Sequence, residues 1–154
     1  MLAEFIWTTV LPVLGTVALG AAGWVVANYV GEPLLRFSRL RGEIHESLIF
    51  TRNISDGAAA EAYSAAVDEL RRHSARLSGL WDAGSPALRK WWKARSYDLP
   101  AAADALIGLS NSFSDVRGNR AVFRHYIQRA LRLPTENTPE EIREIRAAAL
   151  RRPF

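Results

Sequence analysis

The sequence predicts an all-α protein: one N-terminal transmembrane helix followed by a four-to-five-helix antiparallel bundle. The side chains between Glu4 and Glu32 are all uncharged. After this run, apolar residues recur at spacings of three and four, the period of a helix with one buried face. Short clusters of Gly, Pro, Ser, Asp and Asn separate these segments, and no stretch shows the alternation of a strand. Because helices joined by short connections pack as antiparallel neighbours, the segments predict a bundle.

The uncharged run, Phe5 to Gly31, is long enough to cross a bilayer core of roughly 30 Å. Thr9 can cap a helix over Val10 to Val30, whereas a start at Phe5 would place Pro12 in the second turn. Aromatic residues suited to the two membrane interfaces lie near its ends: Trp7, Trp24 and Tyr29. The alternatives are a buried core helix of a soluble protein and a cleaved signal peptide, both of which are usually shorter.

The charges that flank the run predict its orientation. Glu4 is the only charged side chain before it, whereas Arg36, Arg39 and Arg41 follow it closely. Because Lys and Arg are retained on the cytoplasmic side, we expect the N-terminus outside and the C-terminal domain in the cytoplasm, across a bacterial inner membrane. Small residues at helical spacing can also let two spans approach closely: Gly15, Ala18 and Ala22. Such residues are common in unpaired spans too, so self-association is one of two interpretations.

Length and composition leave room for one anchor and one globular domain. The chain has 154 residues, a formal net charge of +4 and no Cys. We divide it into the anchor (1–31), a cytoplasmic helical bundle (33–133) and a basic amphipathic C-terminal helix (134–154). The lack of Cys excludes disulfides and thiolate chemistry and fits a cytoplasmic domain. The positive charge favours an anionic membrane surface over nucleic acid, because the Arg residues are interspersed with carboxylates.

Two long amphipathic helices follow the anchor. Pro33 suits the first turn of a helix that ends near Phe50 or Ile54, and its predicted buried face comprises Phe37, Leu40, Ile44 and Leu48. A turn cluster over 53–57 comes next. An Ala-rich helix then continues the same period through Tyr63, Ala66, Val67, Leu70, Leu77 and Trp81.

The remaining helices are marked by their start signals, each a polar cap followed by Pro or Glu: Ser85 with Pro86, Asp98 with Pro100, and Thr138 with Glu141. Asn119 starts a further helix, which Pro134 stops. The helices after Asp98 and Asn119 carry these predicted core residues: Ala103, Leu106, Ile107 and Phe113, then Val122, Phe123, Tyr126, Ile127, Ala130 and Leu131. Gly108 should permit close approach of the Ala-rich helix at Ala58 to Ala66.

No residue pattern indicates catalysis or metal binding. His45, His73 and His125 fall on three different helices, and none follows a Glu by three residues, as helical di-metal sites require. The sequence His45-Glu46 begins like HExxH, but the second His is missing. Glu69 and His73 are typical of a surface pair. Because nucleophile elbows and phosphate-binding loops are missing too, we expect no catalytic residue, no metal or other cofactor and no small-molecule substrate.

The most unusual polar cluster combines two adjacent tryptophans with four cations: Arg89, Lys90, Trp91, Trp92, Lys93 and Arg95. Aromatic rings flanked by Lys and Arg are typical of interfacial anchors, so we predict that this cluster binds the membrane surface. The alternatives are that one Trp packs into the bundle above solvated cations, or that the rings stack on single-stranded nucleic acid. Asn53 and Asn111 are predicted to contact a partner or to bridge two helices.

Three short segments carry a resemblance to other proteins. Glu32-Pro33 follows the apolar run, Leu48-Ile49-Phe50 comes shortly before Asn53, and Leu106 to Asn111 reads Leu-Ile-Gly-Leu-Ser-Asn. On these segments the chain resembles a recurring type of small bacterial single-pass membrane protein with no known activity. The resemblance covers roughly Glu32 to Phe113 and implies a membrane-anchored cytoplasmic helical domain.

Together the patterns predict a membrane-anchored helical interaction or scaffolding module. We expect it to be an accessory subunit whose partners are the lipid bilayer and either another protein or a second copy of the chain. The alternative is an oligomeric membrane-active effector of pore or toxin type, in which the spans assemble and the basic aromatic segment binds lipid. An enzyme is the third interpretation, and a pocket converging on His45, His73 or Glu69 would favour it.

Overall fold

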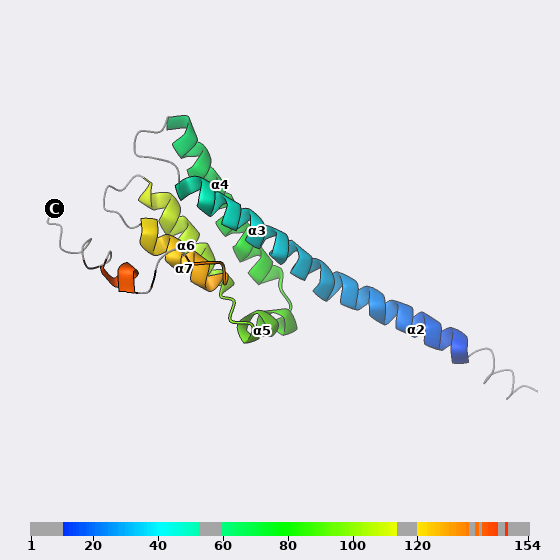
Figure 1. Ribbon diagram of the computed structural model, residues 1–154. Coiled ribbons are helices and arrows are strands. Elements are labelled where there is room, and N and C mark those ends of the chain that lie inside the picture. Colours follow the sequence, from blue (N-terminus) through cyan, green and yellow to red (C-terminus); the bar gives the residue numbers. More distant parts are fainter. Residues whose placement is uncertain are drawn as a thin grey trace, which may run out of the picture. The chain divides into compact units, whose positions relative to one another are not determined.

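The computed structural model describes residues 11–52, 60–113, 120–135, 138, 140–144 and 147 (Figure 1). Its main elements are all helical: α2 (Leu11–Val26), the π-helical turn η2 (Ala27–Gly31), α3 (Glu32–Arg52), α4 (Ala60–Ala83), α5 (Pro86–Ala94), α6 (Leu99–Ser112) and α7 (Arg120–Ala130). Within these residues no strand is present, which confirms the predicted all-α class. The chain divides into two units, Met1–Arg36 and Phe37–Phe154.

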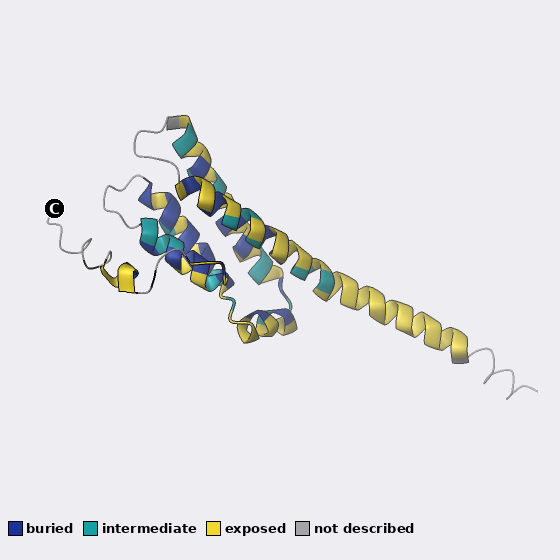
Figure 2. Cartoon of the chain, in the orientation of Figure 1, coloured by how far each residue is buried: buried dark blue, intermediate teal, exposed yellow. Residues whose placement is uncertain are grey.

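The first unit contains one apolar helix. Every side chain from Pro12 to Val30 is exposed, although most of them are apolar (Figure 2). This helix is long and apolar enough to cross a membrane. The first charged side chains after it, Glu32 and Arg36, form an exposed ion pair with each other.

A π-helical turn joins α2 to α3. The N–H of Glu32 donates to the carbonyl of Ala27, five residues back instead of the usual four. Pro33 follows in the first turn of α3, as predicted. Because a proline ring has no N–H and crowds the carbonyl four residues before it, a wider turn fits this position better than a regular one. The helical backbone therefore continues through Gly31 without a loop.

The second unit is an antiparallel bundle. Ser47 of α3 contacts His73 of α4, whereas Glu43, one turn earlier, contacts Arg76, later along α4, so the two helices run in opposite directions. Helix α6 packs against both α4 and α7. The N–H of Asp98, which caps α6, donates to the carbonyl that ends α7, so these two helices are antiparallel as well.

The core of the bundle follows the predicted helical periods. Its largest fully buried side chains come from the helices α3 to α7 and from the turn after α7: Ile44 and Leu48 of α3, Leu70 and Leu77 of α4, Trp92 of α5, Leu99, Leu106 and Leu109 of α6, Ile127 of α7, and Leu131. The predicted caps are also present. Ser85 and Asp98 each accept an N–H from three residues further on, at 3.3 and 3.1 Å. Thr138 and Glu141 bond reciprocally, at 2.7 and 3.3 Å, as a capping box should.

Two residues that the sequence placed in the core are instead exposed. Ile107 of α6 is 39% exposed and Tyr126 of α7 is 44% exposed. Helix α7 buries His125 and Gln128 in addition to its aliphatic residues. Apolar residues cover a broad arc of α7, so the period alone does not fix which part of that arc is innermost. Tyr126 lies at the edge, where its hydroxyl group can reach water.

The predicted neighbour of Gly108 is also wrong. A Cβ atom at this position would lie only 2.3 Å from the Phe123 ring of α7. The missing side chain therefore makes room for an aromatic ring and not for the Ala-rich part of α4. Sequence periodicity showed that Gly108 needs a close neighbour but could not identify the helix that supplies it.

Replacing Gly108 with Ala is expected to lower the free energy of unfolding by about 1–2 kcal/mol. Overpacking against Phe123 costs about 1–3 kcal/mol, and the better helix propensity of Ala offsets part of that cost. Urea denaturation followed by circular dichroism measures the change. In a Phe123→Leu background the same substitution should cost less, because the ring is gone. An equal cost in both backgrounds would contradict the contact.

Candidate functional site

The short helix α5 carries the basic aromatic cluster predicted to bind membranes. Ser85 and Pro86 start it, and Leu88 and Trp92, one turn apart, form its buried face. Trp92 has no exposed surface, whereas Trp91 is 38% exposed. The assignment of Trp92 to a surface site is therefore wrong, because Trp92 shares the buried face of α5 with Leu88 and Trp91 does not.

Trp92 holds α5 against the rest of the unit. Its ring contacts the Phe37 ring of α3, with the centroids 5.9 Å apart, and the Trp81 ring of α4 at 6.1 Å. The turn between α4 and α5 is close to it as well, since a Cβ atom at Gly84 would lie 2.9 Å from the Trp92 ring. The aromatic contacts therefore fix the orientation of α5 and leave its opposite face to solvent.

The cations of the cluster have different roles. Arg89 donates to the carbonyls of Trp81 and Asp82, at 2.9 and 2.7 Å, and so caps the C-terminal end of α4. It also lies over the Trp81 ring. Lys90, Lys93 and Arg95 are exposed. Arg89 is thus mainly structural, whereas the other three cations face solvent.

Two further arginines, distant in sequence, join this surface. Arg41 of α3 donates to the carbonyls of Leu131 and Arg132, at 2.8 and 2.6 Å. Arg132 in turn donates to the carbonyl of Arg95 at 3.1 Å. We call the resulting surface the α5 face: Arg41, Lys90, Trp91, Lys93, Arg95 and Arg132. The sequence did not reveal Arg41 and Arg132 as members, because no local pattern relates residues about 90 positions apart.

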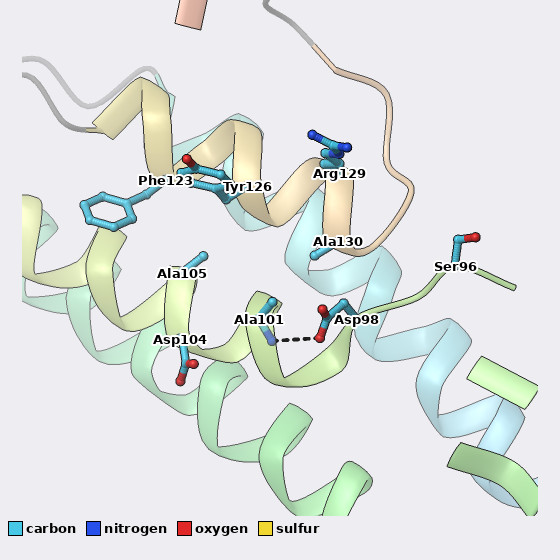
Figure 3. Close-up of a pocket in the computed structure, with 9 residues that line it drawn as sticks. All are labelled: Ser96, Asp98, Ala101, Asp104, Ala105, Phe123, Tyr126, Arg129 and Ala130. Carbon is cyan, nitrogen blue, oxygen red and sulfur yellow. Dashed lines mark hydrogen bonds between the residues drawn. The ribbon is translucent and has the colours of Figure 1, made fainter. Parts of the chain in front are cut away.

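A groove lies between α6 and α7 (Figure 3). Its volume is about 600 Å³, within the range of ligand-binding clefts. Aromatic side chains of α7 face small ones of α6 across it, and the lining residues are Ser96, Asp98, Ala101, Asp104, Ala105, Phe123, Tyr126, Arg129 and Ala130. The Asp98 carboxylate is already occupied by its N-cap bond. The groove is thus an open surface with aromatic and alanine walls and a charged rim.

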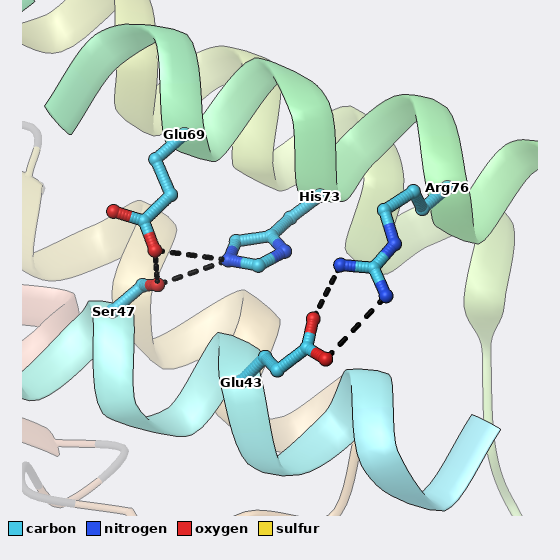
Figure 4. Close-up of polar contacts among 5 residues, drawn as sticks. All are labelled: Glu43, Ser47, Glu69, His73 and Arg76. Carbon is cyan, nitrogen blue, oxygen red and sulfur yellow. Dashed lines mark hydrogen bonds and ion pairs between the residues drawn. The ribbon is translucent and has the colours of Figure 1, made fainter. Parts of the chain in front are cut away.

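A polar network lies between α3 and α4 (Figure 4). Ser47 donates to Glu69 Oε1 at 2.7 Å, and His73 Nε2 lies 2.9 Å from the Ser47 hydroxyl oxygen and 3.5 Å from the same carboxylate oxygen. Arg76 and Glu43 form an ion pair beside it. His73 is only 3% exposed. The expectation of a surface pair is therefore wrong for His73, because Ser47 and the facing helix cover its ring.

The geometry of this network differs from that of a catalytic triad. In a triad the acid and the serine occupy different nitrogens of the imidazole. Here Glu69 and Ser47 both lie at Nε2, and Nδ1 is buried with no hydrogen-bond partner among the residues described. Since Ser47 is buried too, substrate could not reach its hydroxyl. The arrangement links α3 to α4 and has the geometry of a structural contact.

Burial lowers the pKa of His73 below 6.5, and the nearby Glu69 carboxylate only partly opposes this effect. The unfolded chain therefore binds a proton more readily than the folded one, so stability should fall as the pH drops below about 6.5. We expect a loss of up to about 1.4 kcal/mol per pH unit from this residue. Urea denaturation at pH 7.5 and 5.5 measures this loss, and the His73→Gln variant should lose less stability between the two pH values. An equal loss of stability in the native chain and in the variant would refute the prediction.

The other predicted site residues are not members of these features. Gly15, Ala18 and Ala22 are exposed on α2, and a Cβ atom at Gly15 would meet nothing within 4 Å. Asn111 is exposed and accepts a hydrogen bond from Arg71 at 3.5 Å, which links α6 to α4. Asn53 lies outside the described residues. No group of three acidic or His side chains suited to a metal ion occurs in the part of the chain described.

Comparison with protein-family models, with curated proteins and with solved structures finds no match. The function is therefore inferred from the chemistry of the chain itself.

Proposed function

We propose that the protein is a membrane-anchored interaction module. The helix Leu11–Gly31 would cross the cytoplasmic membrane of a bacterium with the N-terminus outside, and the helical unit would bind a partner protein inside. The observation that carries this proposal is the exposure of every side chain from Pro12 to Val30. In water so much exposed apolar surface is unfavourable, at roughly 25 cal/mol per Å², and a lipid environment removes that cost.

The polar side chains of the helix support a lipid environment. Thr16 donates to the carbonyl of Pro12 at 2.9 Å, and Asn28 donates to the carbonyl of Trp24 at 2.8 Å. In a bilayer, where no water is available, polar groups need partners within the protein. The Thr16 hydroxyl and one N–H of the Asn28 amide are thus satisfied by their own helix, which lowers the cost of inserting these residues.

The groove between α6 and α7 is our proposed partner site. Phe123 and Tyr126 provide aromatic surface, which is enriched at protein interfaces. The exposed Asp104 and Arg129 are at the rim, where charges contribute to the choice of partner more than to affinity. A partner helix with an apolar face and flanking charges of both signs would match this surface.

Topology can be tested directly because the chain has no Cys. In intact cells, a membrane-impermeant maleimide should label Ala3→Cys, whereas Ala94→Cys should be labelled only after the membrane is permeabilised. Carbonate extraction should leave both variants in the membrane pellet. Labelling of Ala94→Cys in intact cells would reverse the proposed orientation, and a chain extracted by carbonate would eliminate the anchor.

Partner binding is tested by photocrosslinking in cells. A photoreactive amino acid in place of Tyr126, in the groove, should give one discrete adduct that mass spectrometry identifies. The control places the same amino acid at Ser78, an exposed position of α4, where no adduct is expected. An adduct of two identical chains would indicate self-association. Adducts that are equal at both positions, or missing at both, would contradict a partner site in the groove.

A further inference from the structure

We infer that the α5 face docks on the anionic surface of the membrane that holds the anchor. The inference rests on the proposed membrane anchor and goes beyond it, because it assigns a lipid-binding surface to the helical unit itself. The ligand class is the anionic phospholipid headgroup. Three observations support it: the arrangement of the cations, the exposed ring of Trp91 and the short chain distance to the anchor.

Four of the five cations of the α5 face are held in place by uncharged groups, and none of the four forms an ion pair with a described residue. The guanidinium groups of Arg41 and Arg132 donate to main-chain carbonyls, which bear no formal charge. Lys93 lies 5.8 Å from the Trp81 ring centre, and Arg95 lies 5.5 Å from that of Trp91. These contacts hold the four cations in place and preserve their charge, as binding to an anionic surface requires.

The cations of the α5 face outnumber the described carboxylates that flank α5 in the sequence. Asp82 and Asp98 flank α5 in the sequence. Asp98 is used as the N-cap of α6. Five cations belong to the face against these two carboxylates, so the net charge of these residues is positive, and a surface rich in anionic lipid is complementary to it.

Trp91 supplies the apolar part of the surface. It lies next to Lys90 on the solvent side of α5, and its ring is stacked on Tyr97 at a centroid distance of 6.4 Å. An indole ring with cations beside it matches the boundary between headgroups and acyl chains. Trp92, which is buried, takes no part in this contact.

Only a short stretch of chain links the apolar segment to the residues that contact α5. Phe37 contacts both Trp92 and Tyr97, at centroid distances of 5.9 and 4.9 Å. Gly31 ends the apolar segment only six residues before Phe37, so even a fully extended chain would span at most about 22 Å. The anchor thus raises the effective concentration of lipid near α5, and weak attraction is enough for docking.

The test uses the full-length chain with Ala94→Cys as its only cysteine, labelled with an environment-sensitive fluorophore. Ala94 is exposed on α5. The chain is reconstituted into vesicles of phosphatidylcholine alone or with about 30% phosphatidylglycerol, each with brominated lipid as quencher. We expect at least twofold stronger quenching in the anionic vesicles, and most of this difference should disappear in about 1 M salt, where the Debye length is about 3 Å.

A matched pair of variants identifies the responsible charges. Lys90→Gln, Lys93→Gln and Arg95→Gln together should abolish the extra quenching. The control removes three exposed cations elsewhere on the unit, Arg71, Arg72 and Arg143, and should retain it. Circular dichroism verifies that both variants fold. Quenching that is equal in neutral and anionic vesicles, or lost equally in both variants, would overturn the inference.

Failure of the anchor and failure of docking give different results. If the anchor proposal is wrong, the chain will not float with the vesicles after a carbonate wash. If only docking is wrong, the chain will float but its label will stay unquenched in anionic vesicles. A label that responds to single-stranded RNA and not to anionic lipid would assign the α5 face to nucleic acid, and the docking inference would be wrong.

Discussion

The Trp92→Ala variant is expected to lose about 3–5 kcal/mol of stability, enough to unfold much of the helical unit. The substitution removes a fully buried ring that contacts Phe37 and Trp81, and so detaches α5 from α3 and α4. Chemical denaturation of the detergent-solubilised chain, followed by circular dichroism, measures the loss.

Two controls make this result specific. Trp91→Ala removes a ring of the same size that is partly exposed, so it should cost clearly less. Trp92→Phe should cost less than Trp92→Ala because it keeps an aromatic ring. It also removes an indole N–H that is buried without a hydrogen-bond partner in the described part of the chain. Similar losses for Trp91→Ala and Trp92→Ala would contradict the structure.

The second large effect concerns the apolar helix. Introducing Leu19→Arg and Ala22→Arg together should prevent membrane insertion. Each Arg near the centre of a span costs roughly 2.5–3.5 kcal/mol on insertion scales. The share of the protein that resists carbonate extraction should therefore fall from nearly all to a minor part.

Ser38→Arg and Gly42→Arg form the matched control. They add the same charge at exposed positions of α3, outside the apolar segment, and a Cβ atom at Gly42 meets nothing within 4 Å. This variant should stay in the membrane. If both double variants behave alike, the apolar helix does not determine localisation.

Most of the helices were predictable because their signals are local. Ser85, Asp98 and Thr138 were identified as caps from a few neighbouring residues, and each makes the expected bond. The long apolar helix could likewise be predicted from its uncharged run alone, without knowledge of contacts between helices. Helix periodicity and capping depend on residues within one or two turns, so neighbouring residues in the sequence are enough to predict them.

The composition of the surfaces was less predictable because it depends on packing. The sequence could not decide which of Trp91 and Trp92 is buried, and it gave no reason to group Arg41 with Arg132. His73 was expected at the surface, although Ser47, 26 residues away, covers its ring. Contacts between helices distant in sequence decide each of these cases, and residue spacing does not encode them.

The position of α6 between α4 and α7 has a consequence for local unfolding. Its amide protons can exchange with solvent only when contacts to two partner helices are lost, whereas the short helix α5 is held by Leu88, Trp92 and the bonds of Arg89 to the end of α4. In deuterium exchange, the amides of α6 should therefore report the global opening of the unit, and those of α5 should exchange earlier. The helix proposed to meet the lipid would then open before the bundle core does.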